Sequence, residues 1–188
     1  GGRLASVEAV SDTAGLATAG TWTLGQQLGP NTVRASAVGL GAVQGVEFNA
    51  FGLAGPPTTM RVAVGDNQVG PEGAVLPFAP AVRVTDGFGN NVGGVPVTFT
   101  AAARSGSLAT TSAVTDSASG LAFAGQWTLG TDSVQSVVAQ STVLPTQGVT
   151  FRARLGVARY NIDVRFVGAG GSPAQRASVQ RAAGRWQE

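Results

Sequence analysis

The sequence predicts an all-β chain built from β-sandwich units of roughly a hundred residues each. Short apolar segments alternate at period two and are separated by turns rich in Gly, Asn, Asp and Ser, which is typical of sandwich proteins. The composition agrees, since the 188 residues include 28 Gly and 9 Pro and only 12% are charged. A Trp-Thr-Leu-Gly sequence also occurs twice, at residues 22–25 and 127–130, in matching surroundings.

The repeat extends well beyond these four residues. The further matches, with small shifts between blocks, are Leu4 with Leu108, Ala5 with Ala109, Ala9 with Ala113, Val10 with Val114, Asp12 with Asp116, Val33 with Val137, Ala35 with Ala139, and Gln44, Gly45, Val46, Phe48 and Ala50 with Gln147, Gly148, Val149, Phe151 and Ala153. This period is too long for a solenoid unit of ~20 to 50 residues and suits a small domain. Because Gly1 aligns near Ser105, inside the second unit, we expect the first unit to contain only its C-terminal half.

These matches predict four segments. Residues 1–51 are the C-terminal half of a truncated sandwich, 52–58 a linker, 59–155 a complete sandwich, and 156–188 the start of a truncated third domain. Pro56 and Pro57 favour an extended, partly stiff linker, which predicts that adjacent domains are held apart. A half-sandwich lacks a partner sheet for its core face, so residues 1–51 are expected to be marginal or aggregation-prone in isolation.

Alternation defines the strands and core of the complete unit. Strands are predicted at residues 60–64, 82–84, 95–101, 121–129 and 149–155, with Leu121, Phe123, Trp127 and Leu129 on one face. The predicted core consists of Trp22, Leu24, Phe48, Phe99, Leu121, Trp127, Leu129 and Phe151. Exposed indoles serve as sugar-stacking platforms in some proteins, but alternation with the following Leu residues places both Trp side chains in the core.

Polar turns separate these strands. Residues 86–91 and 116–120 each begin with Asp, and the second turn matches residues 12–15. Asp caps its own backbone, and Gly and Asn tolerate positive φ, so these residues are interpreted as structural. Asp66, Asp86, Asn90 and Asp116 also offer hard oxygen ligands and are weak calcium candidates. Their spacing does not fit an EF-hand, so we prefer the capped-turn interpretation and expect no cofactor.

The pattern changes after the second unit. Residues 160–166 alternate as a strand, and residues 168–171 form a Gly-rich turn. Ser172 suits a helix N-cap, Pro173 the first helical position, and Gln175 completes a capping box. The apolar face of this helix consists of Val179, Ala182, Ala183 and Trp186. The turn is not read as a phosphate-binding loop, because it lacks the third Gly of the dinucleotide fingerprint.

The residue types exclude most enzyme classes. The chain has no His and no Cys, and all 12 basic residues are Arg. These absences remove the Ser-His-Asp triad, the Cys nucleophile with its usual base, the ordinary zinc site and the Schiff-base lysine. The carboxylates are scattered over turns rather than paired across a cleft, which disfavours glycoside hydrolysis. We therefore expect this chain not to be an enzyme.

The charge is unevenly distributed. Residues 1–150 hold 5 Arg and 8 carboxylates, whereas residues 151–188 hold 7 Arg and 2 carboxylates. A nucleic-acid footprint would combine basic residues with stacking aromatics or a recognisable reading module, and neither is present. No apolar run approaches the ~18 residues of a membrane span. We expect neither nucleic acid nor a membrane span.

One set of motifs is specific in order and spacing. It comprises Val84, Thr85, Asp86, Gly89, Asn90, the Gly-Val-Pro-Val-Thr-Phe sequence at 94–99, Thr115, Asp116, the Gly-Leu-Ala sequence at 120–122, and residues 127–130. Because of these motifs, the segment of residues 59–154 resembles bacterial Ig-like repeats of the invasin and intimin type. The resemblance implies an extracellular or cell-surface protein in which Ig-like sandwiches stack into a stalk, sometimes with an adhesive tip.

A second resemblance covers the C-terminal segment. Through residues 160–166 and a helix ending near Arg185 and Trp186, residues 159–188 resemble the first strand and helix of leishmanolysin-like metzincin zinc metallopeptidases. The family's H-E-x-x-H motif would lie beyond Glu188.

Three functions follow as hypotheses. The first is a non-catalytic, exported stalk or presentation module whose partners are neighbouring Ig-like repeats and a C-terminal domain of the same polypeptide. The second is the N-terminal accessory region of a secreted zinc metallopeptidase. The third is an adhesin repeat that binds a host or matrix ligand, for which the sequence offers no distinctive patch.

Overall fold

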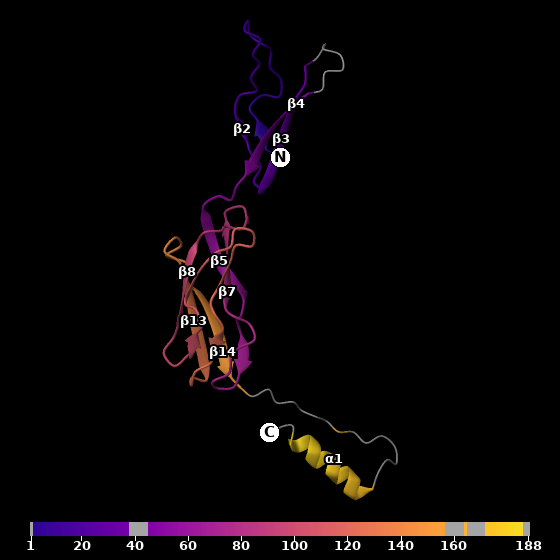
Figure 1. Cartoon of the computed structure of the whole chain (residues 1–188), viewed down its shortest axis with the longest axis vertical. Helices are drawn as coiled ribbons and strands as arrows, with labels where there is room; N and C mark the ends of the chain where they lie inside the picture. The colour runs from indigo at the N-terminus through magenta and orange to yellow at the C-terminus, as the bar shows by residue number, and fades with distance from the viewer. Residues whose placement is uncertain (1, 38–44, 157–163, 165–171, 186–188) are drawn as a thin grey trace.

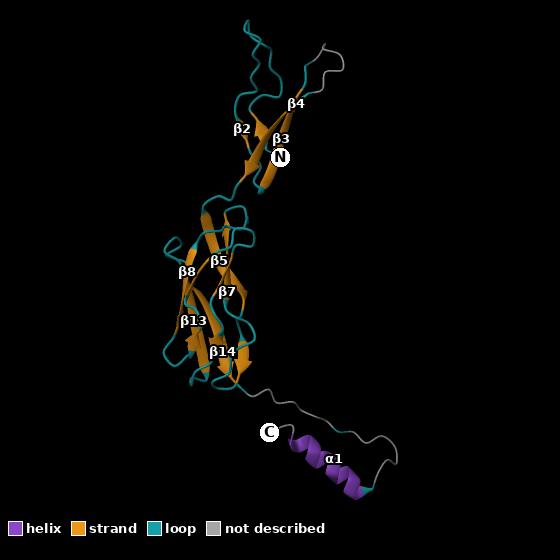
Figure 2. Ribbon diagram, viewed as in Figure 1, coloured by secondary structure: helices purple, strands orange, loops and turns teal. Residues whose placement is uncertain are grey.

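The computed structural model describes residues 2–37, 45–156, 164 and 172–185. Within these residues there are fourteen strands and one helix, so the predicted all-β class is confirmed. The strands form two bodies, residues 2–37 with 45–52 and residues 57–155, that follow one another along the long axis of the molecule (Figure 1). Apart from the helix, the regular structure in Figure 2 is strand.

Two main sheets make up the second unit. The larger has the order β10 (Ser112–Val114), β8 (Pro96–Ala101), β13 (Val134–Gln140), β14 (Val149–Leu155) and β6 (Gln68–Gly70), in which only β6 pairs in parallel. The smaller has the order β11 (Leu121–Phe123), β7 (Ala81–Asp86) and β5 (Pro57–Val64). A short pair, β9 (Ser107–Leu108) with β12 (Trp127–Thr128), lies outside both.

The core of this unit lies between the two sheets. Val82 and Val84 of β7 are fully buried, as are Phe99, Val137 and Phe151 of the larger sheet. The rings of Phe99 and Phe151 lie 6.4 Å apart with 43° between their planes. Because side chains alternate across a strand, Phe99 and Phe151 point into this core while the residues on either side of each are exposed. Burial of each such large side chain stabilises the fold by about 1.5–3 kcal/mol.

The predicted linker, residues 52–58, overlaps the first two residues of β5. Pro57 begins β5 and pairs with Asp86, so the residues outside strands between the units are 53–56 rather than 52–58. Proline is tolerated there because β5 is an edge strand and Pro57 is its first residue. Gln147 holds this edge against the other sheet, since its side chain accepts from the Met60 amide at 2.9 Å and donates to the Thr58 carbonyl at 2.6 Å.

Trp127 is fully buried, and its indole N–H donates to the Ser105 carbonyl at 2.7 Å. Leu129 is also buried, whereas Leu121 is only half-buried and Phe123 is 49% exposed. The sequence placed all four on one face, and the structure corrects this. The chain leaves β11 after Phe123 and pairs again as β12 with β9, so the alternation does not continue across residues 124–126.

In this part of the chain, the inward-facing side chains are those of Ala122 in β11 and Ala124 just after it. They are 1% and 3% exposed. The change of face occurs at Gly125, whose amide donates to the Thr110 carbonyl at 3.0 Å. A Cβ at Gly125 would lie 2.2 Å from the Thr110 nitrogen, so no other residue fits this close approach without a shift of the backbone.

A polar side chain is also part of this core. Gln135 is fully buried, accepts from the Gly130 amide at 2.8 Å, and donates to the carbonyls of Gly130 and Asp132, each at 2.9 Å. These bonds satisfy both ends of the amide, as burial of a polar group requires. They tie the loop after β12 to the start of β13.

The first unit repeats part of this arrangement. β1 (Arg3–Leu4) pairs with β2 (Trp22–Thr23), and β3 (Gly29–Ala35) pairs with β4 (Val46–Gly52). The registers match those of the second unit: Leu4 opposes Trp22 as Leu108 opposes Trp127, and Val33 opposes Phe48 as Val137 opposes Phe151. Among the described residues, the first unit has no strands equivalent to those from β5 to β8.

This difference corrects three core predictions. Phe48 is 54% exposed, although its counterpart Phe151 is fully buried. Trp22 and Leu24 are half-buried, whereas Trp127 and Leu129 are buried. The reason is the missing cover: Phe151 packs with Phe99 of β8 inside a two-sheet core, and the described residues place no equivalent of β8 or of the second sheet around Phe48.

The C-terminal segment forms α1 (Pro173–Arg185). The predicted capping box is confirmed, since the Ser172 amide donates to Gln175 Oε1 at 2.8 Å and the Gln175 amide donates to Ser172 Oγ at 3.4 Å. In the described part of the chain, no helix has the length and apolar character needed to cross a bilayer. The predicted strand at 160–166 and the Gly-rich turn at 168–171 lie outside the described residues, apart from Val164, and so does Trp186.

Candidate functional site

Three turns of one kind contain Asp12, Asp86 and Asp116. In each, Oδ1 of the Asp side chain accepts backbone amides two residues and three or four residues further on, at 2.8–3.0 Å. This is the capped turn that the sequence predicts. The turns at 86–91 and 116–120 are neighbours, because Asn91 donates its side-chain amide to the Ala118 carbonyl at 2.9 Å.

Asp86 differs from Asp12 and Asp116 in the use of its second oxygen. Its Oδ2 accepts the backbone amide of Gly55, in the segment between the two units, at 2.9 Å. The side-chain amide of Asn90 donates to the same oxygen, also at 2.9 Å. Asp86 is 4% exposed, so these bonds are largely shielded from water. The turn therefore holds the connecting segment as well as itself.

Asn90 extends this network into the first unit. Besides its bond to Asp86, its Nδ2 donates to the backbone carbonyl of Gln26 at 2.7 Å. Gln26 directly follows the repeated Trp-Thr-Leu-Gly sequence. One hydrogen-bonded series thus links Gln26, Asn90, Asp86 and Gly55, and we call these four residues the joint.

The donors around Asp86 change its acidity. The side-chain hydrogen bond from Asn90 and the backbone amides of Gly55, Asn90 and Phe88 favour the charged carboxylate, outweigh the opposing effect of burial, and lower the pKa of Asp86 from 3.8 to about 2. The amide and hydroxyl of Ser119 likewise lower the pKa of Asp116. The Asp86 carboxylate is therefore ionised, and the joint intact, across the range from neutral pH to mildly acidic pH.

The four calcium candidates do not gather at one point. Asp66 follows the end of β5, whereas Asp86 pairs with Pro57 at its beginning. Asp66 accepts the Arg152 amide at 2.7 Å and the side chain of Asn67 at 2.9 Å, and both oxygens of Asp86 accept amides. Across the described ranges, no group of three or more acidic residues is placed to hold a metal ion.

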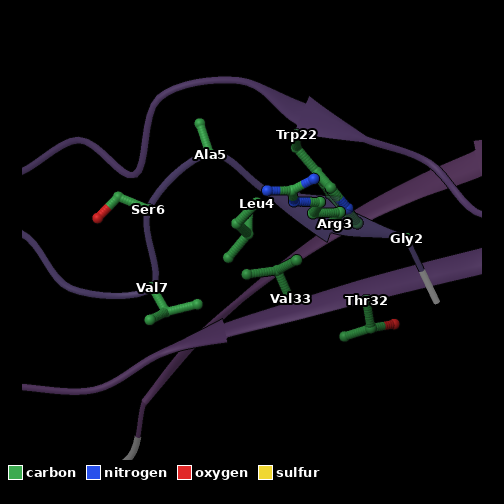
Figure 3. Close-up of a pocket in the computed structure, with 9 residues that line it drawn as sticks. All are labelled: Gly2, Arg3, Leu4, Ala5, Ser6, Val7, Trp22, Thr32 and Val33. Carbon is green, nitrogen blue, oxygen red and sulfur yellow. The ribbon is translucent and has the colours of Figure 1, made fainter.

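A second feature is a groove of about 740 Å³ on the open face of the first unit. It is lined by Gly2, Arg3, Leu4, Ala5, Ser6, Val7, Trp22, Thr32 and Val33. Figure 3 shows the side chains of Leu4 and Val33 next to each other in this groove. In the second unit, their counterpart Val137 belongs to the closed core and Leu108 packs against it. The groove therefore lies where the second unit has its core.

Sequence reasoning found part of the joint. Asp86 and Asn90 were singled out by residue type, but Gln26 and Gly55 contribute backbone atoms, which leave no signal in the sequence. Gln135 was also missed. Its counterpart is Asn31, which is 3% exposed and accepts the Gly25 amide at 3.1 Å, so the repeat changes residue type at this position.

The comparisons with known proteins give structural neighbours only. No protein-family model matches the chain, and no curated protein matches it. Among solved structures, the D0-D1 domain of intimin is similar with a TM-score of 0.38 and 18% identity, over 81% of this chain and 76% of that one. The D00-D0 domain of intimin has a TM-score of 0.40 and 14% identity, over 81% and 78%.

Neither structure is similar enough to assign a family, and the β-sandwich assignment follows from the strand pairing and the buried core described above.

Proposed function

We propose that this chain is a non-catalytic stalk or presentation module of a bacterial cell-surface or extracellular protein. Its partners in this proposal are neighbouring Ig-like repeats and a C-terminal domain of the same polypeptide. The joint is the observation that carries the proposal, because a spacer must transmit position from one unit to the next, and here side chains as well as the chain itself connect the units.

The connection is short and anchored at both ends. Four residues, 53–56, separate β4 from β5, and the Gly55 amide within them is held by Asp86. Asn90 then reaches past this segment to the Gln26 carbonyl. A short connector that is held by a hydrogen bond at Gly55 and bridged by Asn90 restricts rotation between the units more than a free linker of the same length, which samples many orientations.

The residue types support the same function. The chain has no His, Cys or Lys, and the buried polar side chains of its described residues are satisfied within the fold. Asp86, the carboxylate with the largest shift in acidity among the described residues, holds the turn and the connector rather than facing a cavity. Its role in this proposal is positioning.

The experiment measures the relative orientation of the two units in solution. In the wild-type chain, residual dipolar couplings of residues 29–52 and 57–155 should fit alignment tensors of similar magnitude, as for a joint with restricted motion. In Asn90→Ala the tensors should diverge, because the bond to Gln26 is removed. Asn91→Ala is the matched control, since Asn91 lies in the same turn and its side chain bonds only to Ala118 among the described residues.

Two results would overturn the proposal. One is a wild-type chain whose units already tumble with unrelated tensors. The other is an Asn90→Ala chain that remains indistinguishable from the Asn91→Ala control.

A further inference from the structure

Two arginines lie directly opposite each other on the outer face of the smaller sheet of the second unit. Arg61 of β5 and Arg83 of β7 are partners in an antiparallel pair of strands, and both side chains are exposed. Directly opposite residues of such a pair have Cβ atoms about 4.5–5.5 Å apart, and like charges at these positions destabilise the sheet. An anion bound between the two guanidinium groups would remove this repulsion.

The carboxylates of the second unit do not neutralise the pair. Within the part of the chain that the structure describes, the ion pair is that of Arg104 with Asp132. Glu72 lies in the loop after β6, where the neighbouring Gly73 amide donates to the Leu129 carbonyl at 3.1 Å. The other three carboxylates of the unit accept main-chain amides, and they are Asp66, Asp86 and Asp116.

An arginine of the first unit shows the usual arrangement. Arg34 of β3 is also exposed, and its partner across the strand pair is Glu47 of β4. Opposite charges therefore face each other there, and such a pair stabilises a sheet. Arg61 and Arg83 occupy the same kind of position without a carboxylate across from either one.

A hollow of about 290 Å³ lies at the arginine pair. Its lining residues are Arg61, Val62, Ala63, Arg83 and Thr85, none of which is acidic. Thr85 is half-buried and lies on the same face of β7 as Arg83, because alternate residues of a strand share a face. Two guanidinium groups and a residue with a hydroxyl group thus line one open space.

We propose that Arg61, Arg83 and Thr85 form a binding site for a tetrahedral dianion, that is, a sulfate or phosphate group. Guanidinium groups present N–H donors in a planar fork that bonds two oxygens of an oxyanion at once. A dianion balances both guanidinium charges, whereas a carboxylate balances one of them. Because the hollow is open to solvent, the site takes the group either as a free ion or as an ester of a larger molecule.

A sulfate titration of the intact chain tests the proposal. Sodium sulfate replaces sodium chloride at constant ionic strength, and NMR follows the backbone amides and the arginine Nε–H groups. We expect the signals of Arg61, Arg83 and Thr85 to shift and to saturate, while the signals of Arg34 stay unchanged. Sodium acetate should bind at least about tenfold more weakly than sulfate, because it brings a single negative charge to two guanidinium groups.

Substitutions identify the residues that bind the anion. Arg61→Gln and Arg83→Gln should each weaken sulfate binding at least about tenfold, because each removes charge-assisted hydrogen bonds. Arg61→Lys keeps the charge without the planar fork and should have an intermediate affinity. The matched control is Arg34→Gln, which removes the same charge from an exposed strand position opposite Glu47 and should leave the affinity unchanged.

Thermal unfolding without sulfate shows that the variants fold. Arg61→Gln and Arg83→Gln remove the repulsion between like charges, so at low ionic strength the second unit should be at least as stable as in the wild-type chain. Sulfate should then raise the unfolding temperature of the wild-type second unit more than that of either variant, since an anion that binds the folded state stabilises it.

Two further probes distinguish the free ion from the ester. Inorganic phosphate and methyl phosphate are compared at a pH of about 7.5, where both are largely dianions. Equal binding of the two assigns the site to an esterified group, because three oxygens are then enough. Binding of inorganic phosphate alone assigns it to the free ion.

The proposal fails on any of three results. The first is the absence of a saturable shift at Arg61 and Arg83. The second is acetate that binds as tightly as sulfate, and the third is Arg34→Gln weakening sulfate binding as much as Arg83→Gln does.

Discussion

The two units contain the same hairpin in the same register, but the described residues place a second sheet over the hairpin of the second unit alone. Val137 and Phe151 are fully buried, whereas Val33 is half-buried and Phe48 is 54% exposed. The comparison separates two properties of a sandwich. Strand pairing follows from the local alternation and the turns, and is present in both units. Burial of the core requires the opposite sheet, and is present in one.

The largest expected difference concerns the paired tryptophans. Trp127→Ala should lower the free energy of unfolding of the second unit by about 3–5 kcal/mol, because it removes a fully buried indole and leaves a cavity. Trp22→Ala should cost the first unit much less, since Trp22 already meets water. Urea titrations followed by amide signals of β13 and of β3 measure the two effects separately. Equal losses of stability in the two units would contradict the comparison.

A smaller difference is expected for the buried amides Gln135 and Asn31. Gln135→Ala leaves the Gly130 amide and two carbonyls without their partner, and should destabilise the second unit by about 1–3 kcal/mol. Among the residues that the structure describes, Asn31 makes two such bonds, to Gly25 and Gly29, beside an open face. Asn31→Ala should therefore have the weaker effect in the same urea titrations, and a stronger effect would show that the first unit is closed in solution.

Acid should weaken the joint over a defined pH range. Because the pKa of Asp86 is lowered from 3.8 to about 2 in the folded chain, its ionisation stabilises the fold fully above the ordinary value. This contribution disappears as the pH falls from about 4 towards about 2. Thermal unfolding of the second unit should shift to lower temperature over this range, and Asp86→Asn should reduce the shift.

Glu72→Gln is the control for the acid prediction, because Glu72 is exposed and its substitution removes one charge without touching the joint. If Asp86→Asn and Glu72→Gln alter the pH profile equally, the shift does not arise from the bonds around Asp86.

The sequence predicts the strand pairing better than the burial. The match of Val33 with Val137 and of Phe48 with Phe151 is reproduced in the registers, because alternation and turn residues are local signals. The exposure of Phe48 depends on strands far away in the chain, which no local pattern around Phe48 records. The same applies to Leu121, because the buried side of the chain switches from Ala122 and Ala124 to Trp127 and Leu129 around Gly125, whose amide bonds to the Thr110 carbonyl.

The joint shows a similar limit. Asp86 and Asn90 are typical turn residues, and their role within the turn follows from the sequence. Their bonds to Gly55 and Gln26 involve main-chain atoms of another segment, so the connection between the units emerges only from the structure.

Native-state hydrogen exchange tests the central claim most directly, because it compares equivalent amides of β3 and β13 in one sample. We expect amides of β13 to exchange only through unfolding of the whole second unit, and those of β3 to exchange much faster through local opening. Equal, slow exchange in both strands would show that the first unit has a closed core, and would contradict the account.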